Sequence, residues 1–185
     1  MAFAATISKT RRALDEIAVD VDAWFDRAEQ LRRYQPSGGG WNIEQILEHV
    51  SLTNHFLLLT CEKHSRIALQ RAERGDRIPE GESDLERMAD IGERGSFRWI
   101  RPEHMEPTGA RPFADVRSAI FRQWEQCNAI LGALGGGEGA LCHVTMTVHG
   151  LGKIDLYQWL YFVVLHARRH VQQMAAIEAE FTGLR

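Results

Sequence analysis

His166 and His170 are two histidines spaced four residues apart, in a segment whose apolar residues recur at helical spacing. On a helix this spacing places both imidazoles on one face, about 6 Å apart. One metal ion could then bind both rings. Two hydrogen-bonded core histidines would show the same spacing, so the pair alone leaves both interpretations open. A shared metal ion would satisfy one buried ring nitrogen of each.

His49 is the candidate for a third ligand. It lies on the apolar face that we expect for a second helix, and a packed neighbouring helix could bring it opposite the pair. We predict that this inward face consists of Ile46, His49, Leu52, Phe56 and Leu59. Three neutral imidazoles leave coordination positions open, and an ion held in this way lowers the pKa of a bound water or thiol, or polarises a carbonyl.

Other reactive side chains are given no role in this site. Glu48 adjoins His49 but should point about 100° away around the helix, toward solvent, so no general base is assigned. Cys127 lies on the apolar face of a third expected helix, where a free cysteine packs as a small hydrophobic residue. We expect the remaining histidines to be packing or solvated residues: His55, His64, His104, His143 and His149.

The elements that would position these residues are four long helices. The first should cover about residues 7–34. The second should start at Asn42, an N-cap with Gln45 in the capping-box position, and end near Arg74. The third should run from about Phe113 to about residue 134, before three consecutive glycines. The last should begin near Asp155 as its N-cap.

The segments between these helices are polar and rich in glycine and proline. The connection 75–112 exceeds the length of most loops, of which few pass about 15 residues. We expect a short helix around residues 85–91, with Trp99 and Ile100 as isolated apolar anchors. Residues 142–147 could be extended but have no obvious partner strand, and residues 150–153 should form a turn. We predict an all-α four-helix bundle with one long crossover, as a single domain spanning residues 1–185.

Composition and charge exclude several classes of protein. The 25 acidic and 22 basic residues are mixed along the chain, which argues against nucleic acid as a partner. The most apolar stretch, residues 156–165, is roughly half as long as a membrane span. The first positive charges come at Lys9 and beyond, after the apolar start, unlike the order in a secretory signal. Three irregularly spaced cysteines suggest no disulfide framework, so we expect a cytoplasmic protein.

Two segments resemble the DinB/YfiT-like superfamily, whose members are described as metalloenzymes. The first, residues 40–50, reads Gly-Trp-Asn-Ile-Glu-Gln-Ile-Leu-Glu-His-Val, and the second, residues 152–173, ends in the pattern H-x3-H-x2-Q. The resemblance extends over roughly residues 8–180. Asn42 stands where serine or threonine is commoner in the family, and asparagine also caps helices.

The resemblance implies a four-helix bundle, often dimeric, so a homodimer is expected. It also implies that His49, His166 and His170 bind zinc, nickel or another divalent ion, with Gln173 beside them as an outer or pocket residue of the cofactor site. Some relatives are thiol-dependent transferases or isomerases, and others are described as hydrolases. Fold alone does not choose between these reactions.

We therefore expect an enzyme in which the metal activates a low-molecular-weight thiol or water for attack on a small electrophile. The alternative is a non-catalytic stress-response or metal-binding protein in which the histidines are structural or vestigial. A third hypothesis, a DNA-damage protein acting on nucleic acid, is disfavoured by the acidic charge balance and the lack of a basic stripe.

Overall fold

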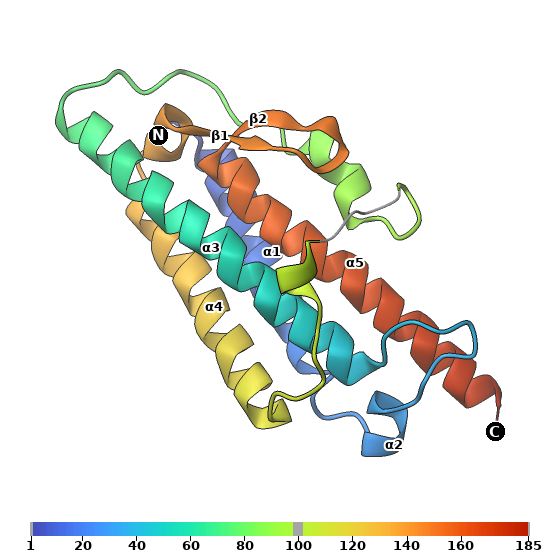
Figure 1. Ribbon diagram of the computed structural model, residues 1–185. Helices are drawn as coiled ribbons and strands as arrows, with labels where there is room; N and C mark the ends of the chain where they lie inside the picture. The colour runs from blue at the N-terminus through green and yellow to red at the C-terminus, as the bar shows by residue number, and fades with distance from the viewer. Residues whose placement is uncertain (1, 98–101, 185) are drawn as a thin grey trace.

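A computed structural model describes residues 2–97 and 102–184 of the chain. Its long helices are α1 (Ala4–Asp22), α3 (Ile43–Glu73), α4 (Phe113–Ala133) and α5 (Leu156–Gly183). Helices α3 and α4 run in one direction and α1 and α5 in the other (Figure 1). Because α1 and α3 each pack against both α4 and α5, the four helices enclose one core. The predicted all-α bundle with a long crossover, here between the parallel helices α3 and α4, is confirmed.

The two helices that carry the candidate ligands both begin at a capping box. The Asn42 side chain accepts a hydrogen bond from the Gln45 backbone N–H at 2.9 Å, and the Gln45 side chain accepts one from the Asn42 N–H at 3.1 Å. Asp155 and Gln158 make the same reciprocal pair at 2.9 and 3.1 Å. These bonds satisfy N–H groups that a helix start leaves unpaired. Both predicted starts are confirmed.

Helix α5 is the central element of the bundle. Every residue from 156 to 167 is buried, because α1, α3, the long connection and a β-hairpin all pack against this half of the helix. The Trp159 indole N–H donates to the carbonyl oxygen of Leu57 at 2.9 Å and so joins α5 to the middle of α3. Burial of this apolar surface is the main force that holds the helices together. It fixes the level at which the α5 histidines meet α3.

The prediction of one helix over residues 7–34 was wrong at its C-terminal end. Helix α1 stops at Asp22, and after a turn the short α2 (Glu29–Arg32) follows. Phe25 packs against Phe113, the first residue of α4, with ring centroids 4.8 Å apart. If the helix continued straight, Leu31 would lie roughly 9 Å past Phe25 along the axis, beyond this end of the core. The turn instead lets Leu31 become buried.

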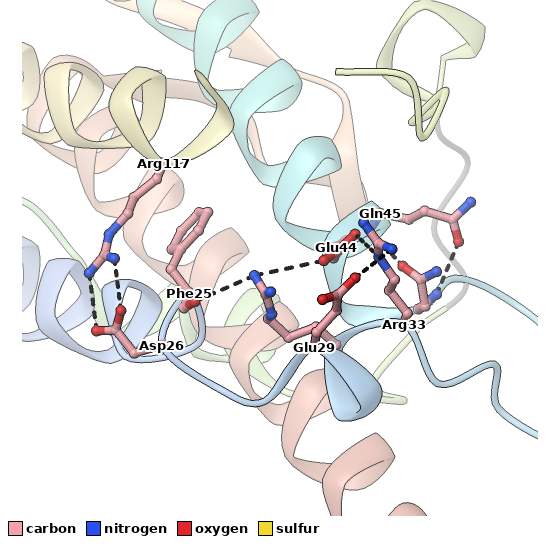
Figure 2. Close-up of polar contacts among 9 residues, drawn as sticks. Phe25, Asp26, Glu29, Arg33, Glu44, Gln45 and Arg117 are labelled. Carbon is pink, nitrogen blue, oxygen red and sulfur yellow. Dashed lines mark hydrogen bonds and ion pairs between the residues drawn. The ribbon is translucent and has the colours of Figure 1, made fainter. Parts of the chain in front are cut away.

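Two arginines hold this turn against the neighbouring helices (Figure 2). Arg117 of α4 bonds both Asp22 and Asp26 at 2.8 Å. At the start of α3, Glu44 pairs with Arg33 at 3.2 Å. Each exposed pair contributes little by itself, but several together order a loop. These pairs fix the position of the segment that leads into α3, whose second turn carries a candidate ligand.

The expected inward face of α3 was only partly right. Ile46 and His49 are buried, but Leu52 and Phe56 are half-buried and Leu59 is 50% exposed. The reason is that α3 packs against both α4 and α5, so its buried surface is wider than one stripe and is rotated from the predicted one. The additional buried apolar residues of this helix are Ile43, Leu47, Val50, Leu57, Leu58, Cys61 and Ala68.

The long connection between α3 and α4 contains two short 3-10 helices, η1 (Glu86–Gly92) and η2 (Glu103–Met105). The first confirms the expected short helix near residues 85–91, and it packs against α5. The second packs against α3. The proposed anchors Trp99 and Ile100 lie outside the residues that the structure describes.

A β-hairpin precedes α5, and this corrects the expectation that residues 142–147 have no partner. Strand β1 (His143–Met146) pairs antiparallel with β2 (Gly152–Asp155), in a register that sets His143 opposite Asp155. Between the strands lie Thr147, the 3-10 helix η4 (Val148–Gly150) and Leu151. Another 3-10 helix, η3 (Glu138–Leu141), lies between α4 and β1. The predicted turn at residues 150–153 is thus a turn followed by a strand. Two-residue periodicity is hard to recognise in strands of four residues.

Two further sequence observations concern cysteines and membrane spans. Cys61, Cys127 and Cys142 are buried free thiols. Burial raises the pKa of the Cys61 thiol to about 12 and that of Cys127 further, so both stay protonated and unreactive. Over residues 2–97 and 102–184, no helix has the length and apolar character needed to cross a membrane.

Candidate metal centre

His49, His166 and His170 lie together in the core, where α3 faces α5. Each offers a ring nitrogen within 4.8 Å of a nitrogen of the other two. The ring centroids are 5.3 Å apart for His49 and His166, 4.8 Å for His49 and His170, and 4.6 Å for the α5 pair. Only 2 to 8% of each residue is exposed. The packing of antiparallel helices thus brings together residues more than 100 positions apart.

Hydrogen bonds on the outer side orient two of the three rings. The Nδ1–H of His49 donates to the carbonyl oxygen of Met105 at 2.7 Å, and the Nδ1–H of His170 donates to Oε1 of Gln173 at 3.0 Å. In a neutral imidazole the second nitrogen then carries a lone pair. Nε2 is therefore the nitrogen of each ring that can bind a metal ion. An outer hydrogen bond of this kind is common in metal-binding histidines.

The Nε2 atoms of His166 and His170 face each other at 3.2 Å. Two lone pairs at this separation repel unless a proton or a cation lies near both. Burial lowers the pKa of His166 well below 6.5, and the neighbouring His170, His49 and Arg169 lower it further. His166 is therefore neutral at physiological pH. Neutral imidazole is the form that binds metal ions, so the three residues fit a divalent cation.

The histidines form one wall of a cavity of about 350 Å³. Its other walls are mostly apolar and come from the start of α3, the long connection and the β-hairpin. The apolar lining residues are Trp41, Leu57, Pro102, Met105, Met146 and Val148. Thr53, Thr147 and Gln173 add polar groups. A small molecule can therefore reach the three rings from one side, within a largely water-excluding surface.

The remaining five histidines do not join this cluster. His55, His104, His143 and His149 are exposed, and His64 donates to the Thr60 carbonyl one turn earlier at 2.8 Å. His149 stacks on Phe97 with centroids 4.3 Å apart, and its Nε2 lies 3.7 Å from an Asp90 oxygen. Their positions on the surface or in connections suit packing or solvation.

Glu48 overturns the expectation of a solvated side chain, since it is only 3% exposed. It does point away from His49, but a loop covers that face of α3: the Thr108 hydroxyl and the Gly109 N–H donate to its two carboxylate oxygens. Sequence reasoning also missed Met105, because residues in an aperiodic connection give no signal of what they contact. Trp41, which belongs to the segment of residues 40–50 already noted in the sequence, packs with its ring 4.7 Å from that of His49.

Of three comparisons with known proteins, one found a match. A search of the curated proteins and a search of the solved structures each returned no match. The family model of the DinB superfamily matches residues 2–174, which include all three histidines and Gln173. This match covers most of the chain and confirms the resemblance noted in the sequence. The chain therefore belongs to the DinB superfamily.

Proposed function

We propose that His49, His166 and His170 bind one divalent ion, zinc or nickel, and that the protein is a metal-dependent transferase or hydrolase acting on a small molecule. The observation that carries this proposal is the pair of outer hydrogen bonds to Met105 and Gln173. These bonds leave the Nε2 lone pairs of His49 and His170 available to bind the ion. Three protein ligands are the usual number in catalytic zinc sites, whereas structural sites use four.

The bound ion would supply Lewis acidity, which lowers the pKa of a thiol or water in the cavity. The chain supplies the rest: the histidines hold the ion, and the apolar walls exclude bulk water and orient the substrate. None of the described residues lining the cavity is acidic. A thiol with an ordinary pKa of about 8.5 needs less assistance than water to lose its proton. This favours a low-molecular-weight thiol as the nucleophile.

A non-catalytic stress-response or metal-binding protein is the alternative. The cavity argues for catalysis, because a purely structural ion needs no space beside it for a second molecule. The buried free cysteines suit a reducing compartment such as the cytoplasm. Small molecules, rather than nucleic acid, are the expected substrates because the charge balance is slightly acidic.

A second copy of the chain is the proposed protein partner, at the groove between α1 and α4. Val19 is 70% exposed and Phe121 is 62% exposed beside this groove of about 470 Å³. A two-fold axis through Phe121 would pack α4 antiparallel on its copy. Arg117 and Glu125, each four residues from Phe121, would then face each other across the interface.

Metal analysis of the purified protein tests the metal proposal first. We expect about one zinc or nickel per chain and a higher melting temperature with metal than after chelation. Cobalt substitution followed by thiol titration then separates the two chemistries. A thiol that binds the ion directly shifts the visible spectrum, whereas the hydrolase branch predicts a pH-dependent spectrum without thiol. A protein that neither retains nor is stabilised by divalent metal would exclude the proposal.

A further inference from the structure

Residues 104–111, called the strap below, lie along the first half of α3. The His104 ring packs edge-on against Phe56, with centroids 4.3 Å apart. One residue later, the Met105 carbonyl oxygen accepts the hydrogen bond from His49 at 2.7 Å. The strap therefore supplies the group that orients one of the three candidate ligands.

Glu48 holds the strap in place. Its Oε1 accepts from the Thr108 hydroxyl at 3.0 Å and its Oε2 from the Gly109 backbone N–H at 2.8 Å. Arg111 adds a longer bond of 3.3 Å to the Ser51 hydroxyl. A buried carboxylate is costly unless it is hydrogen-bonded, and bonds to an ionised acceptor are stronger than those to a neutral one. Within the described part of the chain, the strap thus supplies the only two hydrogen bonds to the Glu48 carboxylate.

Glu48 lies on the far side of the strap from the metal cavity. It lines a separate cavity of about 410 Å³ together with Arg33, Gln45 and Arg111. It is absent from the walls of the cavity beside the histidines. Glu48 therefore does not contact a molecule bound in the metal cavity, and the strap is the element that contacts both Glu48 and His49.

Glu48 and His49, which are consecutive in the sequence, hold the same strap at two points. If the strap moved away, the Met105 carbonyl would leave His49, and the ring could place its proton on either nitrogen. A ring with its proton on Nε2 cannot bind a metal through that atom. Loss of such outer hydrogen bonds typically weakens metal binding about 10-fold to 100-fold.

We propose that Glu48 is a positioning residue of the metal centre: its carboxylate anchors the strap, and the strap's Met105 carbonyl keeps Nε2 of His49 free for the metal. The proposal rests on the proposed function, because the nitrogen matters only if the histidines bind an ion. It assigns a role to an acidic side chain that neighbours a ligand in sequence and lies outside the reaction cavity.

The test is Glu48→Gln in the full-length protein, with zinc affinity measured by competition with a chelator. The amide has one acceptor oxygen, so its NH₂ group would face one of the two strap donors. We expect zinc to bind about 10-fold more weakly. In the metal-free protein, nitrogen NMR of the histidine rings should show His49 protonated on Nδ1 in the wild type and a mixture of tautomers in the variant.

Glu44→Gln is the matched control, because Glu44 lies on the same helix, pairs with Arg33 at 3.2 Å and makes no bond to the strap. It should leave both zinc affinity and the His49 tautomer unchanged. Thr108→Val removes one strap donor and should shift both readouts in the same direction as Glu48→Gln, by a smaller amount. If Glu48→Gln does not fold, Thr108→Val decides the question.

Unchanged zinc affinity and an unchanged His49 tautomer in a folded Glu48→Gln protein would overturn the positioning role and leave the metal site intact. A wild type that does not bind zinc or nickel would instead overturn the proposed function. In that case the tautomer comparison in the metal-free protein still tests whether Glu48 controls the orientation of His49. The two failures are therefore distinguishable.

Discussion

The Nδ1–H of His170 donates to the Oε1 atom of Gln173 at 3.0 Å, one helical turn farther along α5. Gln173 also lines the cavity. Gln173→Leu removes the acceptor and leaves a similar volume, so His170 loses the bond that directs its Nε2 inward. We expect zinc or nickel to bind about 10-fold to 100-fold more weakly, as measured by chelator competition.

Gln172→Leu is the control for that substitution. The Gln172 side chain accepts a hydrogen bond from the Arg94 N–H at 3.0 Å, outside the cavity. Its loss should leave metal affinity within about twofold of the wild type, since surface changes away from a site have small effects. Equal affinities for the two variants would show that Gln173 does not support the site.

His166→Ala tests the metal ligands and separates the catalytic hypothesis from the non-catalytic one. The wild type should gain about 2.7 kcal/mol from metal at a hundredfold excess over Kd, and the variant should lose most of this gain. A thermal melt with and without zinc measures it, with His64→Ala as the control outside the cluster. If the protein is an enzyme, thiol transfer or hydrolysis is lost together with the metal. A cellular phenotype that persists in His166→Ala would favour the non-catalytic alternative.

The candidate site could be predicted from the sequence largely because its ligands lie on long helices. His166 and His170 show the i, i+4 spacing directly, and the capping residues Asn42 and Asp155 mark where both helices start. His49 could be placed on a buried face because helical periodicity persists over many residues. The family resemblance added Gln173, which periodicity alone does not single out.

Tertiary contacts of irregular segments could not be predicted in this way. The burial of Glu48 depends on a loop 60 residues farther along the chain, and sequence spacing does not encode which face that loop covers. The turn after Asp22 depends on where α4 begins, since Phe25 packs on Phe113. In both cases the local pattern was compatible with the predicted state, and a distant contact decided the outcome.

Asp155→Ala tests how α5 is held at its start. The Asp155 carboxylate caps the helix through the Gln158 N–H at 2.9 Å and also accepts from the Ser83 hydroxyl at 2.6 Å. Loss of an N-cap costs about 1 to 2 kcal/mol, so urea unfolding of the variant should show a loss of this size. Lys153→Ala, on the exposed side of β2, should change stability by less than about 0.5 kcal/mol. Equal losses would exclude a specific capping role.

Phe121→Asp tests the proposed homodimer. The charge would lie on the two-fold axis, where two like charges would face each other across an apolar contact. Light scattering after size exclusion should show a dimer for the wild type and a monomer for the variant. Leu59→Asp also adds a charge at an exposed apolar residue, but on α3, and should remain dimeric. A monomeric wild type would exclude the homodimer. A dimeric Phe121→Asp would place its interface elsewhere.

Glu180→Gln should change stability in a pH-dependent way. Glu180 Oε1 accepts from the Ser37 N–H at 2.8 Å and the Tyr34 hydroxyl at 2.7 Å, and these bonds lower the pKa of Glu180 from 4.5. A carboxyl whose pKa is lower in the folded than in the unfolded state stabilises the protein above its unfolded pKa. This stabilisation is lost as the pH falls through the folded value.

Urea unfolding of Glu180→Gln and the wild type should therefore differ at about pH 7, and the difference should shrink toward zero as the pH falls from 4.5 through the lower folded pKa of Glu180. Tyr34→Phe removes one of the two donors and should reduce the pH dependence without abolishing it. The loop that these bonds hold leads into Trp41, whose ring packs on His49 at 4.7 Å. Metal affinity should therefore fall in Glu180→Gln as well. A stability difference that stays constant or widens in acid would contradict the assigned bonds, because only an ionised Glu180 accepts both donors at full strength.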